Sequence, residues 1–168
     1  MSLSPIINFL TGGKNIEGKT LEDYLSFTEE EMEGCHNHIQ WMFPLKSPSS
    51  FNPNAPLLTD EDIGDFYNNE YLKNQIRRSF YKWLWFCGLQ YDGNEILIVN
   101  YKRVYEIFGK FNHNYLRVTR VLLCLYTLGL RNECDLFYDA LNHPIISKLA
   151  NLESKVFWYE AYHGREKK

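Results

Sequence analysis

The sequence predicts an all-α fold, a single-domain helical bundle of about seven to nine helices around one buried central helix. Three observations support this prediction. Residues 112–129 are apolar on nearly every side of a helical wheel. Helix-starting residues followed by acids recur along the chain, and a β-like run occurs only near residues 96–99. A length of 168 residues favours one domain over residues 1–168.

The central helix over 112–129 should have Asn112 or Asn114 as its N-cap and stop at Gly129. Its apolar residues are Leu116, Val118, Val121, Leu122, Leu123, Leu125 and Leu128. Its one polar stripe consists of Arg117, Arg120, Cys124 and Thr127. Burying an aliphatic side chain gains roughly 1.5–3 kcal/mol, while ordering a residue costs about 1–2 kcal/mol. We therefore expect neighbouring helices to surround this one, which carries two arginines into or near the interior.

The elements before residue 70 are expected to be short. Ser4-Pro5 starts a helix that Gly12-Gly13 ends, and Thr20, Thr28 and Thr59 are N-caps followed by acidic residues. Residues 35–45 are densely apolar and aromatic. The proline-rich stretch 44–58 is predicted to be an extended surface connection.

Longer helices are expected in the remainder. The helix over 70–87 should bury Leu72, Ile76, Phe80, Trp83 and Cys87, with Arg78, Lys82 and Trp85 on the opposite side. Asp92-Gly93 allows one small hairpin near residues 89–99.

Three further helices should complete the bundle. Asn100 caps a helix through Phe108 that should bury Tyr101, Val104, Tyr105 and Phe108. Residues 132–141 are amphipathic, and Pro144 should start one terminal helix. The expected packing stripe of that helix is Ile145, Leu149, Leu152, Val156 and Tyr159.

Composition narrows the function classes. The net charge of −3 gives no basic signature, so we expect no nucleic-acid partner. The four cysteines form no CxxC motif and are typical of reduced thiols in a cytosol. The N-terminus makes a poor signal peptide, and the apolar stretches are too short for a transmembrane segment. We therefore expect a soluble, cytoplasmic protein.

No motif for a cofactor or for catalysis stands out. Cys35, His36 and His38 are metal-ligand types, but their spacing does not place them on one helix face. Cys124, one turn after Arg120, is a candidate nucleophile, although a cysteine on an apolar helix more often belongs to the core. We therefore predict no cofactor, no metal site and no catalytic residue.

Two polar features invite a binding interpretation. His113, Asn114, Arg117 and Arg120 cluster on the N-terminal half of the central helix, where buried arginines need an anionic partner. That partner is either an acid of this chain or a bound anion or ligand carboxylate. The third alternative is that the arginines are simply exposed to solvent. Trp85, beside Arg78 and Lys82, either packs under the proline-rich stretch or forms a surface for a protein partner.

Two segments resemble a known family. HNHIQWMFPL at 36–45 and NHNYLRVTRVLLCLYTLGL at 112–130 resemble the characteristic domain of the opioid growth factor receptor family, with the similarity covering residues 15–142. His38 departs from the aromatic residue usual there. The resemblance implies binding of a short opioid peptide, growth inhibition, and a nuclear or peripheral-membrane location. It implies no catalytic residues.

These observations lead to the hypothesis of a non-enzymatic binding domain for a short peptide or an anionic small molecule. The predicted ligand-binding residues are His36, Gln40, Trp41, Asn114, Arg117 and Arg120. A ligand ring would lie on Trp41 and a ligand carboxylate on an arginine. One alternative is a structural or protein-interaction domain without a small ligand. Another is an enzyme using His36 or His113 on an arginine-bound anionic substrate. The sequence does not indicate the oligomeric state.

Overall fold

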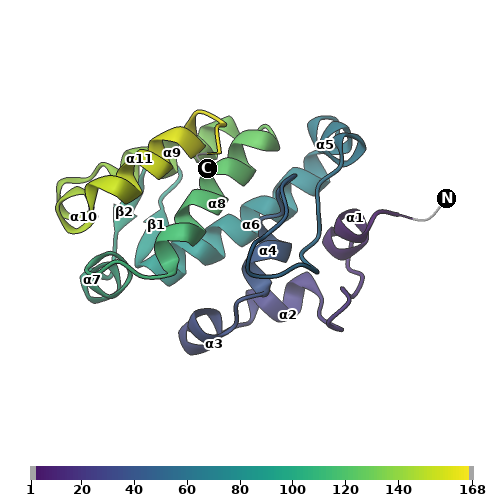
Figure 1. The fold of residues 1–168 in the computed structure, drawn as a ribbon, viewed down its shortest axis with the longest axis horizontal. Coiled ribbons are helices and arrows are strands. Elements are labelled where there is room, and N and C mark those ends of the chain that lie inside the picture. Colours follow the sequence, from purple (N-terminus) through teal and green to yellow (C-terminus); the bar gives the residue numbers. More distant parts are fainter. Residues whose placement is uncertain (1–2, 167–168) are drawn as a thin grey trace. The chain divides into compact units, whose positions relative to one another are not determined.

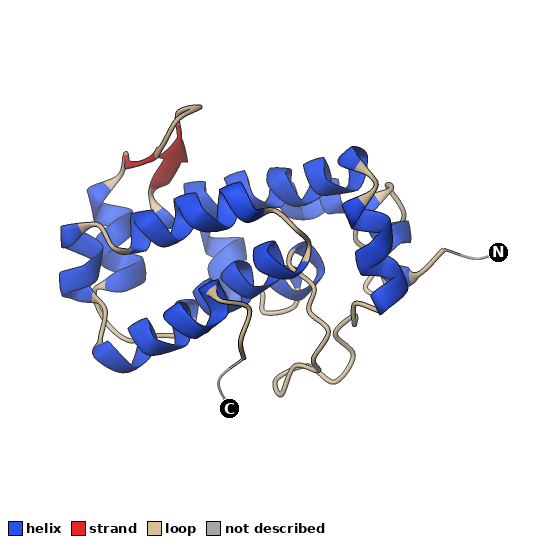
Figure 2. Ribbon diagram, turned by 90° about the horizontal axis from the view of Figure 1, so that it is seen from above, coloured by secondary structure: helices blue, strands red, loops and turns tan. Residues whose placement is uncertain are grey.

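The fold is all-α, as predicted, apart from one small hairpin (Figures 1 and 2). A computed structural model describes residues 3–166, which form eleven helices and two strands. There are more helices than expected because residues 38–42 form a short helix, α4, that was not predicted, and because the predicted terminal helix is two helices, α10 and α11. The chain divides into two compact units between Ser79 and Phe80, within helix α6 (Glu70–Cys87).

The first unit contains short helices connected by ordered loops. They are α1 (Pro5–Leu10), α2 (Leu21–Leu25), α3 (Glu29–Gly34), α4 (His38–Met42), α5 (Asp60–Tyr67) and the start of α6. Complete capping boxes at Thr20, Thr28 and Thr59 confirm the predicted helix starts, because each threonine caps the third helical residue and each acid caps the threonine. The aromatic core includes Phe9, Tyr24, Trp41, Phe43 and Phe66.

The second unit begins with the rest of α6 and the hairpin. Strands β1 (Leu89–Tyr91) and β2 (Ile96–Ile98) are antiparallel, with Gln90 opposite Leu97. The tight connection from α6 depends on Gly88, which has φ +82° and would place a Cβ 2.4 Å from the Asn100 carbonyl oxygen. The remaining helices are α7 (Tyr101–Phe108), α8 (Asn114–Thr127), α9 (Arg131–Leu141), α10 (Pro144–Leu149) and α11 (Leu152–Tyr162).

Helix α8 is the buried central helix that the sequence predicts. It packs against α7, α9 and α11, and nearly all its predicted apolar residues are buried. It begins at Asn114, and the predicted asparagine N-cap is wrong, because His113 occupies that position without a side-chain cap. The Asn112 side chain accepts a hydrogen bond from the Asn114 backbone N–H (2.8 Å) instead. Leu116 is the exception to burial, because 49 % of its surface is exposed.

Two predicted helix faces are wrong. On α7, Tyr101 and Tyr105 are each 53 % exposed, and Arg103 and Ile107 are buried beside Val104 and Phe108 instead. The predicted terminal helix is two helices, since the backbone extends at Ala150 and Asn151 caps α11 anew. The buried stripe is Ile146, Ala150, Ser154, Trp158 and Ala161, while Leu152 and Tyr159 are exposed, because the face of α11 that packs against α8 is the one that carries Trp158.

The four cysteines are free thiols with unequal burial. Cys87, Cys124 and Cys134 are buried, whereas Cys35 is half-buried. Burial raises the pKa of the Cys124 thiol, and it raises the pKa of Cys134 to about 12, which suppresses the reactive thiolates.

We expect a thiol-specific reagent at pH 8 to label Cys35 first, because access and thiolate character both control reactivity. The other three thiols should react only after urea unfolds the chain. Counting labelled thiols with time by mass spectrometry checks this, with Cys35→Ala as the control. Fast native labelling of Cys35→Ala would contradict the burial of the remaining thiols.

Within residues 3–166, no helix combines the length and the apolar character that crossing a membrane requires.

Candidate functional site

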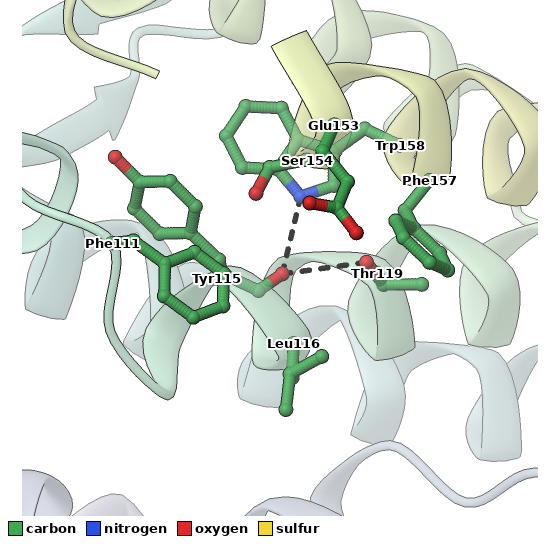
Figure 3. Close-up of a pocket in the computed structure, with 8 residues that line it drawn as sticks. All are labelled: Phe111, Tyr115, Leu116, Thr119, Glu153, Ser154, Phe157 and Trp158. Atoms are coloured by element: carbon green, nitrogen blue, oxygen red, sulfur yellow. Dashed lines mark hydrogen bonds between the residues drawn. The ribbon is translucent and has the colours of Figure 1, made fainter. Parts of the chain in front are cut away.

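A pocket in the second unit lies between the N-terminal halves of α8 and α11 (Figure 3). Its volume is about 210 Å³. The lining residues are Phe111, Tyr115, Leu116, Thr119, Glu153, Ser154, Phe157 and Trp158. The lining residues of each helix share one face because they are spaced about one helical turn apart. Residues 115 and 119 are one turn apart on α8, and residues 153 and 157 are one turn apart on α11.

The floor of the pocket is rigid. The Tyr115 carbonyl accepts hydrogen bonds from the Trp158 indole N–H (3.1 Å) and from the Thr119 hydroxyl (3.3 Å). The Tyr115 hydroxyl donates to the Phe108 carbonyl. The rings of Tyr115 and Trp158 lie 5.4 Å apart, and both side chains are almost fully buried. Fixed rings of this kind form a preorganised apolar surface.

The rim of the pocket is exposed. Phe111 and Leu116 are exposed, and the Phe111 ring lies edge-on to Tyr115 at 5.5 Å. Glu153, in the first turn of α11, is also exposed and is the only charged lining residue. In the view of Figure 3 its carboxylate lies between the Trp158 indole and the Phe157 ring. The site therefore combines an apolar cavity with one negative charge.

Three of the predicted ligand-binding residues lie in the first unit. His36 is exposed, whereas Gln40 and Trp41 are buried. The Gln40 amide donates to the Ser49 hydroxyl (3.1 Å) and accepts from Asn52 (2.6 Å), so it anchors the proline-rich stretch. The Trp41 ring packs 5.3 Å from Phe9 in the core. Both buried side chains thus have structural contacts.

The other three predicted residues lie on α8, in the second unit. Asn114 and Arg117 are buried, and the Arg117 Nη1 donates to the Asn114 Oδ1 (3.2 Å). The Arg117 guanidinium also lies 6.0 Å from the Phe86 ring centre. Arg120 is half-buried, and burial lowers the pKa of its guanidinium. The common pocket predicted for all six residues joins side chains of both units and stays a prediction.

Comparison with known proteins places the chain in a family. The family described as the opioid growth factor receptor (OGFr) conserved region matches residues 8–167. The chain belongs to the opioid growth factor receptor family. It is 32 % identical to opioid growth factor receptor-like protein 1 of Xenopus tropicalis over 96 % of its length, and 30 % identical to the human opioid growth factor receptor over 75 %.

The family match confirms the resemblance seen in the two motifs and extends it toward both ends of the chain. The chain spans about a third or less of the curated relatives, covering 32 % of the Xenopus protein and 19 % of the human one. No solved structure matches the chain.

The pocket of this family member was not predicted, although one signal was present. Phe111, Tyr115 and Thr119 follow a four-residue spacing that leaves Leu116 beside them, but the all-round apolar character of α8 suggested that this face was buried. The other wall comes from α11, about 40 residues later. No local pattern connects the two.

Two other interpretations can be compared with the structure of this family member. Among residues 3–166, no group of three His, Cys, Asp or Glu side chains is arranged to hold a metal ion. Trp85 is 45 % exposed, and the Lys82 ammonium lies 3.9 Å from its ring centre.

Proposed function

We propose that this chain is a non-enzymatic binding domain that recognises a short peptide by taking one apolar side chain into the pocket between α8 and α11. The pocket itself supports this proposal most directly. Its volume of about 210 Å³ is below the roughly 300–1,000 Å³ of sites that enclose a drug-sized molecule. One ring or branched aliphatic group of a longer ligand is the appropriate size.

The relatives add a second line of support. Their names describe receptors, or receptor-like proteins, for an opioid growth factor. A pocket walled by aromatic rings suits a peptide with an aromatic residue, because offset and edge-on ring contacts add to simple burial. The cytoplasmic location expected from the sequence remains part of this proposal.

Titration with the pentapeptide Tyr-Gly-Gly-Phe-Met, followed by NMR, tests the proposal. We expect the indole N–H signal of Trp158 to shift, because this group lies at the pocket floor. Phe111→Ala should weaken binding about threefold to tenfold, the equivalent of one aromatic contact. Phe111 is largely exposed, so its removal should leave the core intact.

Tyr105→Ala is the matched control, since Tyr105 is an exposed aromatic residue that does not line the pocket. It should bind the peptide like the unaltered chain. If millimolar peptide shifts no signal, the proposal of peptide binding in this pocket is wrong.

A protein-interaction function is the second candidate, and Trp85 favours it. Tryptophan is common at binding hot spots, and the Trp85 indole is 45 % exposed. Analytical ultracentrifugation tests the self-association form of this candidate. A concentration-dependent dimer that Trp85→Ala removes would support it, whereas a monomer at all concentrations would count against it.

A further inference from the structure

The carboxylate of Glu153 lacks a partner at the rim of an otherwise neutral pocket. Its side chain forms no hydrogen bond or ion pair with any residue in the range 3–166. The other seven lining side chains are uncharged. No charged side chain of the lining therefore pairs with this carboxylate, and a ligand bound there lies beside one carboxylate as well as aromatic rings.

From this arrangement we infer that the pocket selects a free peptide amino terminus whose first residue has an aromatic or aliphatic side chain. This inference rests on the proposed peptide-binding function and names the ligand group that determines selectivity. An ammonium is attracted both to a carboxylate and to the faces of aromatic rings. A ligand carboxylate at the same place would be repelled.

The depth of the lining residues favours an amino terminus over a lysine side chain. The deep rings of Tyr115 and Trp158 have their polar atoms already hydrogen-bonded, and the buried Ser154 beside them carries no charge, whereas Glu153 is at the exposed rim. The first residue of a peptide carries its ammonium on Cα, at the base of its side chain. The side chain can therefore fill the cavity while the ammonium stays at the rim beside Glu153.

A lysine has the opposite order of groups. Its ammonium is at the far end of an apolar stem, so filling the cavity would carry the charge to the apolar floor and away from Glu153. Desolvating an ammonium without a close partner is unfavourable. The Glu153 carboxylate should therefore favour the ammonium of a peptide amino terminus over the ammonium of a lysine side chain.

The test compares Tyr-Gly-Gly-Phe-Met with its N-acetylated form by NMR titration against the Trp158 indole signal. We expect acetylation to weaken binding about twofold to fivefold, the range for an exposed charge pair. Glu153→Gln should weaken binding of the free peptide by the same factor and should leave the acetylated peptide unaffected. Glu95→Gln, on an exposed residue outside the pocket, is the charge-matched control.

Two small probes test the charge preference without a peptide. Phenethylamine should bind more tightly than 3-phenylpropionate, and Glu153→Gln should remove that difference. An acetylated, lysine-containing tripeptide should not bind more tightly than the free pentapeptide.

The outcomes separate the two proposals. Equal binding of free and acetylated pentapeptide, or tighter binding of the lysine tripeptide, would overturn the amino-terminus inference and leave peptide binding intact. An absence of binding by both pentapeptides would overturn both.

Discussion

Replacing Trp158 with alanine is expected to lower the free energy of unfolding by about 3–5 kcal/mol, the usual cost of removing a buried tryptophan. Trp158 is only 2 % exposed, and its ring contacts Phe108 and Tyr115 at 6.1 and 5.4 Å. The variant loses these ring contacts and leaves a cavity beside α8. It also removes the indole N–H from the Tyr115 carbonyl. Urea unfolding followed by circular dichroism measures the change.

Trp85→Ala is the matched control for this experiment. The same side chain is removed, but Trp85 is 45 % exposed, and the Lys82 ammonium lies 3.9 Å from its ring centre. The expected loss is below about 1 kcal/mol, since an exposed cation–π contact contributes roughly 0.5–1 kcal/mol. Equal losses for the two variants would contradict the placement of Trp158 in the core.

A third variant separates packing from hydrogen bonding. Trp158→Phe keeps most of the ring contacts and removes the indole donor. We expect a loss intermediate between the two alanine variants, because a net hydrogen bond contributes about 0.5–1.5 kcal/mol.

The strongest sequence predictions concern elements with local signals. The start of α2 is specified by Thr20 and Asp23 alone, since each side chain caps the backbone of the other. The hairpin depends on Asp92, whose side chain accepts from the backbone of Asn94 and Glu95. Such contacts act within four residues, so the sequence is sufficient to predict them.

Helix faces were harder to predict, because they depend on what packs against them. In the terminal segment two neighbouring faces carry apolar residues, and the buried face is that of Ile146 and Trp158 rather than the predicted face of Ile145 and Tyr159. Leu116 shows the same limit for the site. Its neighbours in sequence are buried, and only the position of α11 leaves it at a pocket rim. Hydrophobic periodicity therefore predicts the helices, whereas tertiary packing determines which of their faces are buried.

The sequence left open whether the arginines of α8 contact an acid of this chain or a ligand. Substitutions of Arg117 can show whether its role is structural or ligand-binding. It is 5 % exposed, donates to the Asn114 Oδ1, and lies beside the Phe86 ring. These contacts favour a structural role. A ligand carboxylate could reach a guanidinium this deeply buried only if the surrounding side chains moved.

Arg117→Ala should therefore lower the free energy of unfolding by about 2–4 kcal/mol, through the lost stem packing and the lost charged hydrogen bond. Arg117→Met keeps the stem and removes the charge, so it should retain part of that stability. The peptide affinity of folded Arg117→Met should equal that of the unaltered chain. Urea unfolding and the Trp158 NMR titration measure the two quantities separately.

A loss of peptide affinity without a loss of stability would instead support the arginine binding site predicted from the sequence. If Arg117→Met loses tenfold or more in peptide affinity at unchanged stability, its guanidinium binds the ligand. A peptide with an amidated C-terminus identifies the contact, because it lacks the carboxylate that an arginine would bind. A tenfold weaker affinity for the amidated peptide would place the ligand carboxylate on the Arg117 guanidinium.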